Sequence, residues 1–365
     1  MKVMYFRLLC VVMLLVTTNL VKGQEKAYRR DNSLHKIKGT GTLTLKNSYG
    51  DIKLVGWEKD EVFITMAVTV TDKTKKDANL LMDRIRLDVD GQNANQINVS
   101  TVIEELGDSF FSKYFGLGKS VNNGSGKINI DLNVMLPKGL TLSVQNRFGD
   151  LMVEDWKGHL NVKMEHGSIW VNSDLDYANI DLKYGKLKAQ YIGLADLMIE
   201  HGSIQLNNSD LVKLNSTGST IEIKESKEIH VVSNKDELFL DHVKELNGTL
   251  KFTDIEIRQL DFRMDVSLQV SDLELFEVLD TTATLRLWEE SSEIIIHSKE
   301  FDYRFEATLE EGVVRIPKSF GNVKSTIEGR SGPRRQRRII AMSGGKGLGT
   351  IRVEGKKGIV KLLED

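Results

Sequence analysis

Hydrophobic and polar residues alternate along most of the chain, with the period of two that a half-buried β-strand produces. The pattern is clearest over residues 127–134, where every second residue is Ile, Leu or Val. It recurs over residues 179–182 and 220–223. The sequence therefore predicts an all-β protein built from many short strands.

One segment near the front has helical spacing instead. Hydrophobic residues recur there at i, i+3, i+4 and i+7, namely at Ala78, Leu81, Met82 and Ile85. Either Asp72 or Thr74 is suited to cap such a helix at its N-terminus. The spacing predicts one short helix over residues 74–85.

A short motif recurs through the chain: an aromatic residue or His, then Gly, then a small or charged residue, then Ile or Leu. It occurs at residues 49–52, 148–151, 166–169, 184–187 and 201–204, with a weaker copy, one residue longer, at 217–221. From Gly149 onward its glycines follow at Gly167, Gly185, Gly202 and Gly218. Such a nearly constant period is typical of one supersecondary unit used repeatedly. Each unit would hold two short strands and a corner, at which Gly supplies a conformation that a Cβ would resist.

Two architectures fit this unit. In an antiparallel meander, the glycine corner would be a hairpin turn. In a parallel β-solenoid (β-helix) of about 17–18-residue repeats, equivalent residues stack about 4.8 Å apart. Only the solenoid explains why the same kind of side chain returns before each glycine, where Phe148, His166, Tyr184 and His201 would form one ladder. We favour the solenoid and keep the meander as the alternative.

The repeat suggests how the chain is divided. Because the open ends of stacked strands need caps, we assign residues 24–140, with the helix, to an N-terminal β region that caps the stack. The repeats occupy residues 141–275 and fade after about Gly248, and C-terminal strands with a basic loop at 330–338 occupy residues 276–365.

The segment at positions 1–23 has the layout of a secretory signal peptide. Lys2 and Arg7 precede an apolar run from Leu8 to Val16, which is well short of the ~20 residues that span a bilayer. We expect cleavage before Gln24 and no transmembrane segment in the mature chain, with retention as an uncleaved anchor as the alternative.

Composition narrows the class of protein. The 365 residues are 40% hydrophobic and 28% charged, enough to bury a core and too hydrophobic for a disordered chain. The net charge of −2 gives no argument for nucleic-acid binding. Cys10, the single cysteine, lies inside the leader, so the mature chain has no disulfide, thiolate nucleophile or Cys-bound zinc. Export without disulfides indicates a bacterial envelope protein, in the periplasm or on the cell surface.

The sequence resembles the putative adhesin family of exported bacterial β-solenoid proteins, whose domain has no assigned activity. The likeness rests on residues 146–151 and 182–187, on the entry to the repeat at 136–139, and on residues 86–91 after the helix. It covers roughly residues 38–275. The resemblance implies a β-solenoid fold and a location outside the cytoplasm, and it offers no catalytic residues to carry over.

Two pairs of residues are candidates for chemistry, each with a plainer structural interpretation. His166 and His201 each precede Gly-Ser, but two coils would separate them by about 9.6 Å, too far to share one zinc ion, and a stacking ladder is the favoured interpretation. Asp174 and Asp210 lie in similar corners two repeat lengths apart and are the best available acid pair for cleaving a glycosidic bond. Corner Asp residues more often satisfy local backbone groups.

Two further segments are candidates for binding. Residues 108–116 carry four aromatic side chains that would form either an exposed patch or an inward plug, namely Phe110, Phe111, Tyr114 and Phe115. A basic loop is suited either to an anionic partner or to plain solvation, and it carries Arg334, Arg335, Arg337 and Arg338.

These observations favour an exported, non-catalytic binding or scaffold module of the cell envelope, with an unknown envelope protein or glycan as its partner. We expect no cofactor, no metal and no nucleic acid. The alternatives are a carbohydrate-active enzyme on a β-helix and an accessory or sensing component that acts through a membrane partner.

Overall fold

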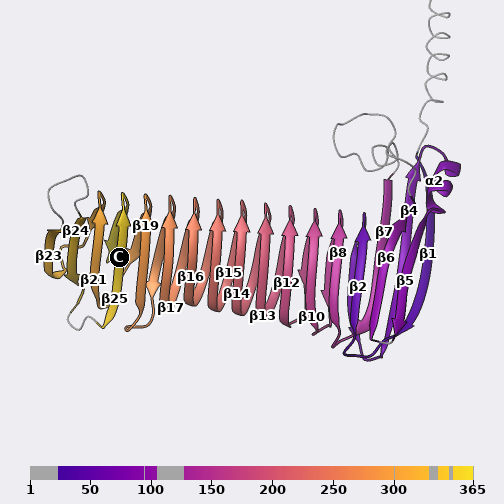
Figure 1. Cartoon of the computed structure of the whole chain (residues 1–365), viewed down its shortest axis with the longest axis horizontal. Coiled ribbons are helices and arrows are strands. Elements are labelled where there is room, and N and C mark those ends of the chain that lie inside the picture. Colours follow the sequence, from indigo (N-terminus) through magenta and orange to yellow (C-terminus); the bar gives the residue numbers. More distant parts are fainter. Residues whose placement is uncertain are drawn as a thin grey trace, which may run out of the picture.

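The computed structural model describes residues 24–93, 95–104, 127–299, 301–328, 336–344 and 348–364. These residues form one long row of strands, with a short helix at the N-terminal end of the row (Figure 1). The 26 strands belong to a single sheet in which most neighbours run parallel. The predicted all-β class is therefore confirmed.

The N-terminal end of the row contains the helix and three antiparallel pairs, and β24 (Gln336–Met342) forms further antiparallel pairs with β21 (Tyr303–Glu310) and β23 (Gly321–Glu328) near the other end. Its elements are β1 (Glu25–Lys36), β4 (Glu61–Asp72), α2 (Lys75–Met82), β5 (Ile85–Asn93), β6 (Gln96–Ile103) and β7 (Lys127–Pro137). Strand β4 pairs with β1 and β7, and β5 pairs with β6.

The helix is shorter than predicted. Thr74 caps it by accepting a hydrogen bond from the Asp77 amide, as one of the two expected caps. It ends at Met82 rather than at residue 85, since Ile85 is paired with Ile103 of β6, and Arg29 of β1 donates hydrogen bonds to the carbonyl groups of Met82 and Ile85. Ile85 is buried as expected, but it opens strand β5.

The body of the row is a stack of parallel strands. Its elements are β2 (Thr42–Ser48), β3 (Ile52–Trp57), β8 (Thr141–Arg147), β9 (Leu151–Glu154), β10 (His159–Glu165), β11 (Ser168–Val171), β12 (Leu175–Lys183), β13 (Lys186–Glu200), β14 (Ser203–Thr217), β15 (Thr220–Asn234), β16 (Glu237–Lys251) and β17 (Asp254–Gln269). Val162 pairs with Val144 on one side and with Ile180 on the other, one sequence period away in each direction. Leu197 likewise pairs with Leu214, and we call the segment of chain from one such residue to its parallel partner a coil. Parallel pairing in this register contradicts the antiparallel meander over this part of the chain.

Buried aliphatic side chains follow the same register. The inward positions of successive strands form continuous rows, one of which runs through Val144, Val162, Ile180, Leu197, Leu214 and Val231. Burial of each such side chain stabilises the fold by roughly 1.5–3 kcal/mol, so these rows hold the coils together.

The stack continues beyond the point where the sequence repeat fades. Its last strands are β18 (Asp272–Val278), β19 (Thr284–Glu290), β20 (Glu293–His297), β21 (Tyr303–Glu310), β22 (Val313–Arg315), β23 (Gly321–Glu328), β24 (Gln336–Met342), β25 (Gly349–Lys356) and β26 (Ile359–Leu363). The sequence repeat is not visible here for two reasons. The number of residues between Val266 and its partner Leu287 exceeds the repeat length, and β19 pairs with β25, which is not the next strand in the chain.

One carboxyl group is buried inside this end of the core. Glu289 is fully buried, and the amides of Ser292 and Gly358 donate to its carboxyl oxygens at 3.3 and 3.2 Å. Burial raises its pKa from 4.5 to about 7. Burial disfavours the charged carboxylate only in the folded state. The resulting loss of stability is absent below pH 4.5, where Glu289 is protonated in both states, and complete above pH 7, where it is charged in both.

We therefore expect the protein to lose about 3 kcal/mol of stability through Glu289 as pH rises from 4.5 to beyond 7. Glu289→Gln should remove this part of the pH dependence, whereas Glu290→Gln, next to it on the strand, should leave it in place. Urea unfolding of the three proteins at pH 4.5 and pH 8 measures the difference. Equal pH dependence in wild type and Glu289→Gln would contradict the prediction.

Candidate binding surface at the aromatic corner

A left-handed residue lies at the corner that follows the parallel strands β2, β8, β10, β12 and β13, at the upper edge of the molecule in Figure 1. In five successive coils this residue is aromatic or His, with φ between 52° and 64°: Tyr49, Phe148, His166, Tyr184 and His201. The amide of each donates to a carbonyl of the neighbouring coil, as in His166 to Lys183 at 3.0 Å. The corner thus fixes both the backbone and the direction of the ring.

The glycine after each ring is required for a different reason from the one expected. The left-handed φ falls on the ring residue, not on the glycine. A Cβ on Gly149 would lie 1.9 Å from the Gly50 carbonyl oxygen, and a Cβ on Gly167 would lie 2.0 Å from that of Gly149. These glycines are needed because the backbones of neighbouring coils approach so closely.

The five rings form one continuous stack, which we name the corner ladder. Its centroid distances are 5.3 Å for Tyr49–Phe148, 5.0 Å for Phe148–His166, 5.1 Å for His166–Tyr184 and 5.4 Å for Tyr184–His201, with planes within 13° of parallel. The predicted ladder is confirmed and is one ring longer than expected. Each stacked pair contributes roughly 0.5–1.5 kcal/mol.

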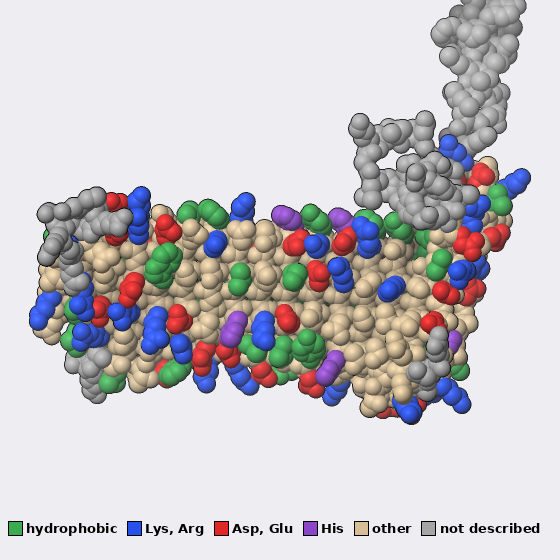
Figure 2. All heavy atoms as spheres, in the orientation of Figure 1, with side chains coloured by type: hydrophobic (Ala, Val, Ile, Leu, Met, Phe, Trp, Pro, Cys, Tyr) green, Lys and Arg blue, Asp and Glu red, His purple; other side chains and the backbone are tan. Residues whose placement is uncertain are grey.

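The corner ladder is open to solvent along its outer edge. Tyr184 is 54% exposed, and His166 and His201 are exposed as well. Figure 2 shows histidine and hydrophobic side chains alternating along this upper edge of the molecule. The faces of the inner rings are covered by their neighbours, so the ladder presents ring edges, hydroxyl groups and imidazole nitrogens.

The ladder stops at Gly218, which takes the left-handed position next to His201. A Cβ there would lie 2.6 Å from the His201 ring. The weaker repeat copy at 217–221 therefore contains no extra residue, because Gly218 corresponds to His201 and Ser219 to Gly202. Beyond it, Lys235, Phe252 and Val270 continue the corner without ring stacking between neighbours.

A row of alternating charges runs beside the corner ladder. It consists of the residues just before the rings: Arg147, Glu165, Lys183 and Glu200. Arg147 pairs with Glu165 at 2.9 Å, and Lys183 pairs with Glu200 at 2.8 Å. Exposed pairs of this kind contribute little to stability, but they give the edge a regular polar pattern.

A second ladder, inside the corner, escapes sequence reasoning. After Gly202, the glycine position of the corner is occupied in turn by Ser219, Asp236, Thr253, Ser271 and Ser292. The side chain of each accepts a hydrogen bond from the backbone amide at the same position in the preceding coil, starting with the Gly202 amide and the Ser219 hydroxyl. The recurring motif identifies only glycine as the corner signal. Aligning the coils by their strand pattern would have shown these residues in the glycine column.

The structure separates the two histidines by one ring. Tyr184 stacks between His166 and His201, as the ladder interpretation predicted. Among the described residues there is no group of three or more His, Asp or Glu side chains placed to hold a metal ion.

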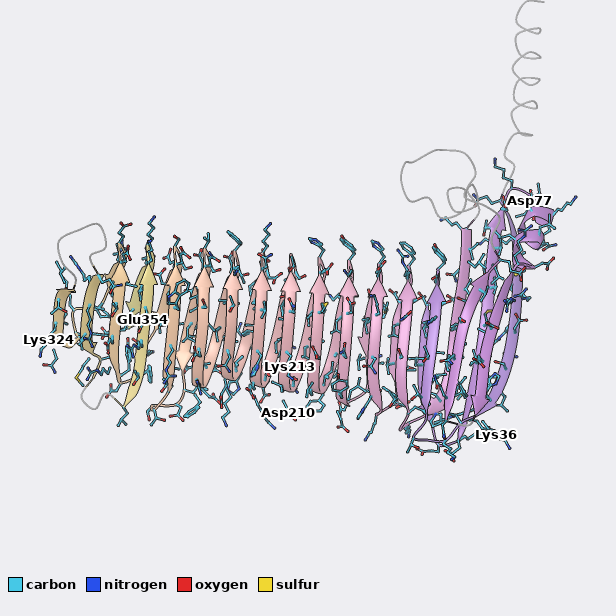
Figure 3. The ribbon with its side chains drawn as sticks, in the orientation of Figure 1. Lys36, Asp77, Asp210, Lys213, Lys324 and Glu354 are labelled. Atoms are coloured by element: carbon cyan, nitrogen blue, oxygen red, sulfur yellow. The ribbon has the colours of Figure 1, made fainter. Side chains whose placement is uncertain are left out.

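The two candidate acids do not form a pair. Leu175 pairs with Ile192, which pairs with Ser209, so Asp210 lies in the column of Asp176 rather than that of Asp174. The Lys227 ammonium at 2.7 Å and the Tyr191 hydroxyl at 2.9 Å hold the pKa of Asp210 below its usual value. Such a group is poorly suited to act as a general acid. Figure 3 places Asp210 at the edge opposite the corner ladder.

Phe110, Phe111, Tyr114, Phe115, Arg334 and Arg335 lie outside the described residues. Arg337 and Arg338 belong to β24, where Arg337 is exposed and Arg338 pairs with Glu306 at 2.6 Å. They are thus strand residues rather than loop residues.

In the part of the chain that the structure describes, no helix is long and apolar enough to cross a membrane.

No protein-family model and no curated protein sequence matches the chain. Among solved structures, it resembles a putative adhesin from Parabacteroides distasonis at 11% identity, covering 92% of this chain and 97% of that one, with a TM-score of 0.36. A putative adhesin from Parabacteroides merdae has 8% identity, the same coverage and a TM-score of 0.34. A putative lipid binding protein from Parabacteroides distasonis has 11% identity, again 92% and 97% coverage, and a TM-score of 0.31. At these values the likeness carries no argument about function.

Proposed function

We propose that the protein is an exported β-solenoid of about 17–18-residue coils that serves as a non-catalytic binding module of the cell envelope. It would act as an adhesin or scaffold in the periplasm or on the cell surface. The leader pattern at residues 1–23 supports export. The in-register pairing of β8 to β17 supports the solenoid.

The corner ladder is the observation that carries the proposal. Five rings at nearly constant spacing line one edge of a rigid parallel sheet and leave their edges in water. A row of exposed aromatic groups on a rigid element is typical of a contact surface.

The class of ligand that suits such a row follows from its repeat. Hydroxyl and imidazole groups recur along the ladder at multiples of the coil spacing, and charged groups recur beside them. An extended polysaccharide offers hydroxyl groups at a comparable repeat, so one chain can make the same contact at several coils. We infer that an envelope glycan is the partner of the corner ladder.

Replacing His166 and Tyr184 together by Asn should weaken glycan binding tenfold or more. Asn tolerates the left-handed corner, so the backbone is kept while the rings are lost. The mature chain, residues 24–365, and the variant are compared on an array of bacterial polysaccharides.

Phe252→Asn is the matched control, because Phe252 has the same left-handed corner conformation and is 53% exposed, but lies outside the ladder. It should bind as wild type does. Absence of glycan binding by the wild-type chain, or equal binding by the ladder variant, would refute the proposed partner.

A further inference from the structure

A groove lies on the outward face of the last parallel strands, away from the corner ladder. It has a volume of about 400 Å³ and is lined by outward residues of β17, β19 and β25. We name it the Trp288 groove, after the exposed aromatic side chain that it contains. Its other outward lining side chains are Asp265, Ser267, Arg286, Arg352 and Glu354. Figure 3 labels Glu354 on this face.

Trp288 is the aromatic member of a row of outward side chains on this face. It is 47% exposed on a strand whose inward neighbours, Leu287 and Glu289, are buried. Its partner on β17 is Ser267, and the next residue in the row is Thr249, so small side chains border the indole on that side. An exposed indole beside small residues offers a flat apolar surface to a ligand.

Two arginines lie side by side next to this indole. Arg286 and Arg352 are direct partners across the β19–β25 pair, and both are exposed. Like charges directly opposite each other on neighbouring strands are destabilising. Trp288 lies two positions from Arg286 on the same face of β19, about 7 Å along the strand.

A carboxylate lies beside each of the two arginines, at distances that leave the Arg286 pair the looser one. Arg286 approaches Asp265 at 3.9 Å, and Arg352 pairs with Glu354 at 2.9 Å on its own strand. Asp265 is shared with Arg263 at 3.6 Å. The groove is thus lined by two guanidinium groups and two carboxylates, Arg263 lies outside this lining, and all of these pairs are exposed to water.

We propose that the Trp288 groove binds a carboxylated glycan. A pyranose ring would stack on the indole of Trp288, and its carboxylate would lie between the guanidinium groups of Arg286 and Arg352. Arginine pairs with carboxylates in a bidentate manner, and Trp and Arg dominate the energetics of binding sites. This site rests on the binding function proposed above and deepens it by assigning a carboxylated glycan to the Trp288 groove. It uses no residue of the corner ladder.

The probe for this site is polygalacturonate, with neutral dextran for comparison. The wild-type chain should bind polygalacturonate and not dextran, with weaker binding at higher salt. Trp288→Ala should reduce the affinity tenfold or more. The double variant Arg286→Lys/Arg352→Lys keeps both charges and loses the planar fork, so it should reduce the affinity about fivefold.

The double variant Phe239→Ala/Arg258→Gln is the matched control, since it removes an exposed ring and an exposed guanidinium from β16 and β17 away from the groove. It should bind as wild type does. Circular dichroism checks that each variant is folded.

Three results would overturn the proposal: equal binding of dextran, unchanged affinity in both groove variants, or tighter groove-dependent binding of single-stranded DNA or anionic lipid vesicles. The His166→Asn/Tyr184→Asn variant should bind polygalacturonate normally. A failure at the groove is therefore distinguishable from a failure at the corner ladder.

Discussion

Replacement of Gly167 by Ala should lower the free energy of unfolding by about 4 kcal/mol. The added Cβ would lie 2.0 Å from the Gly149 carbonyl oxygen and 3.1 Å from the Met164 side chain. A backbone oxygen in a paired coil cannot move away alone, so the coils must separate locally and lose ring stacking at His166. Urea unfolding measures the loss, and hydrogen exchange should show it as reduced protection in β10 to β13.

Gly321→Ala is the matched control for this prediction. Gly321 begins the exposed strand β23, and no atom lies within 4 Å of where its Cβ would be. The same chemical change should therefore alter stability by less than about 0.5 kcal/mol. If Gly167→Ala were as mild as Gly321→Ala, close approach of the coils would not be what requires glycine at the corner.

The corner shows why part of this fold could be predicted from the sequence. A ring residue followed by Gly recurs because neighbouring coils approach each other closely at each of these corners, so each corner needs a glycine and places its ring on the next one. The period, the parallel strands and the ladder from Phe148 to His201 follow from that repetition. The sequence could not show why the glycine is needed, because its missing Cβ makes room for a carbonyl oxygen of the neighbouring coil.

Other parts of the structure depend on contacts that local patterns do not contain. The helix stops at Met82, where Ile85 pairs with Ile103 of β6 and Arg29, from far earlier in the chain, binds the Met82 carbonyl. Strand β25 pairs with both β19 and β21, and this order of the last strands does not follow from the spacing of the sequence repeat. The Trp288 groove likewise joins Arg286 to Arg352, residues far apart in the chain that become partners only through this strand order.

The inner ladder of the corner was missed because its members differ chemically. Ser219, Asp236 and Thr253 share a position, not a residue type. Each satisfies an amide that would otherwise be buried without a partner. Asp236 has the largest number of these contacts, so it offers the sharpest test of the ladder.

Asp236→Ala should lower the free energy of unfolding by about 4 kcal/mol. Asp236 is 3% exposed. One of its carboxylate oxygens accepts from the Ser219 amide at 2.7 Å, and the other accepts from the hydroxyls of Ser216 and Ser233 at 2.6 Å each. Removing the carboxylate would leave the Ser219 amide and the Ser216 hydroxyl buried without this partner, while Ser233 keeps its hydrogen bond to Thr253 at 2.9 Å.

Asp236→Asn should lose less, about 1–2 kcal/mol, because its amide oxygen can still accept from the Ser219 amide while its NH₂ group donates to the serine hydroxyls. Asp254→Ala, which removes an exposed carboxylate at the start of β17, should cause no loss. Urea unfolding ranks the three variants, and hydrogen exchange should show Asp236→Ala reducing protection in β14, β15 and β16 first. Equal stability of Asp236→Ala and Asp254→Ala would mean that the inner ladder does not hold the coils together.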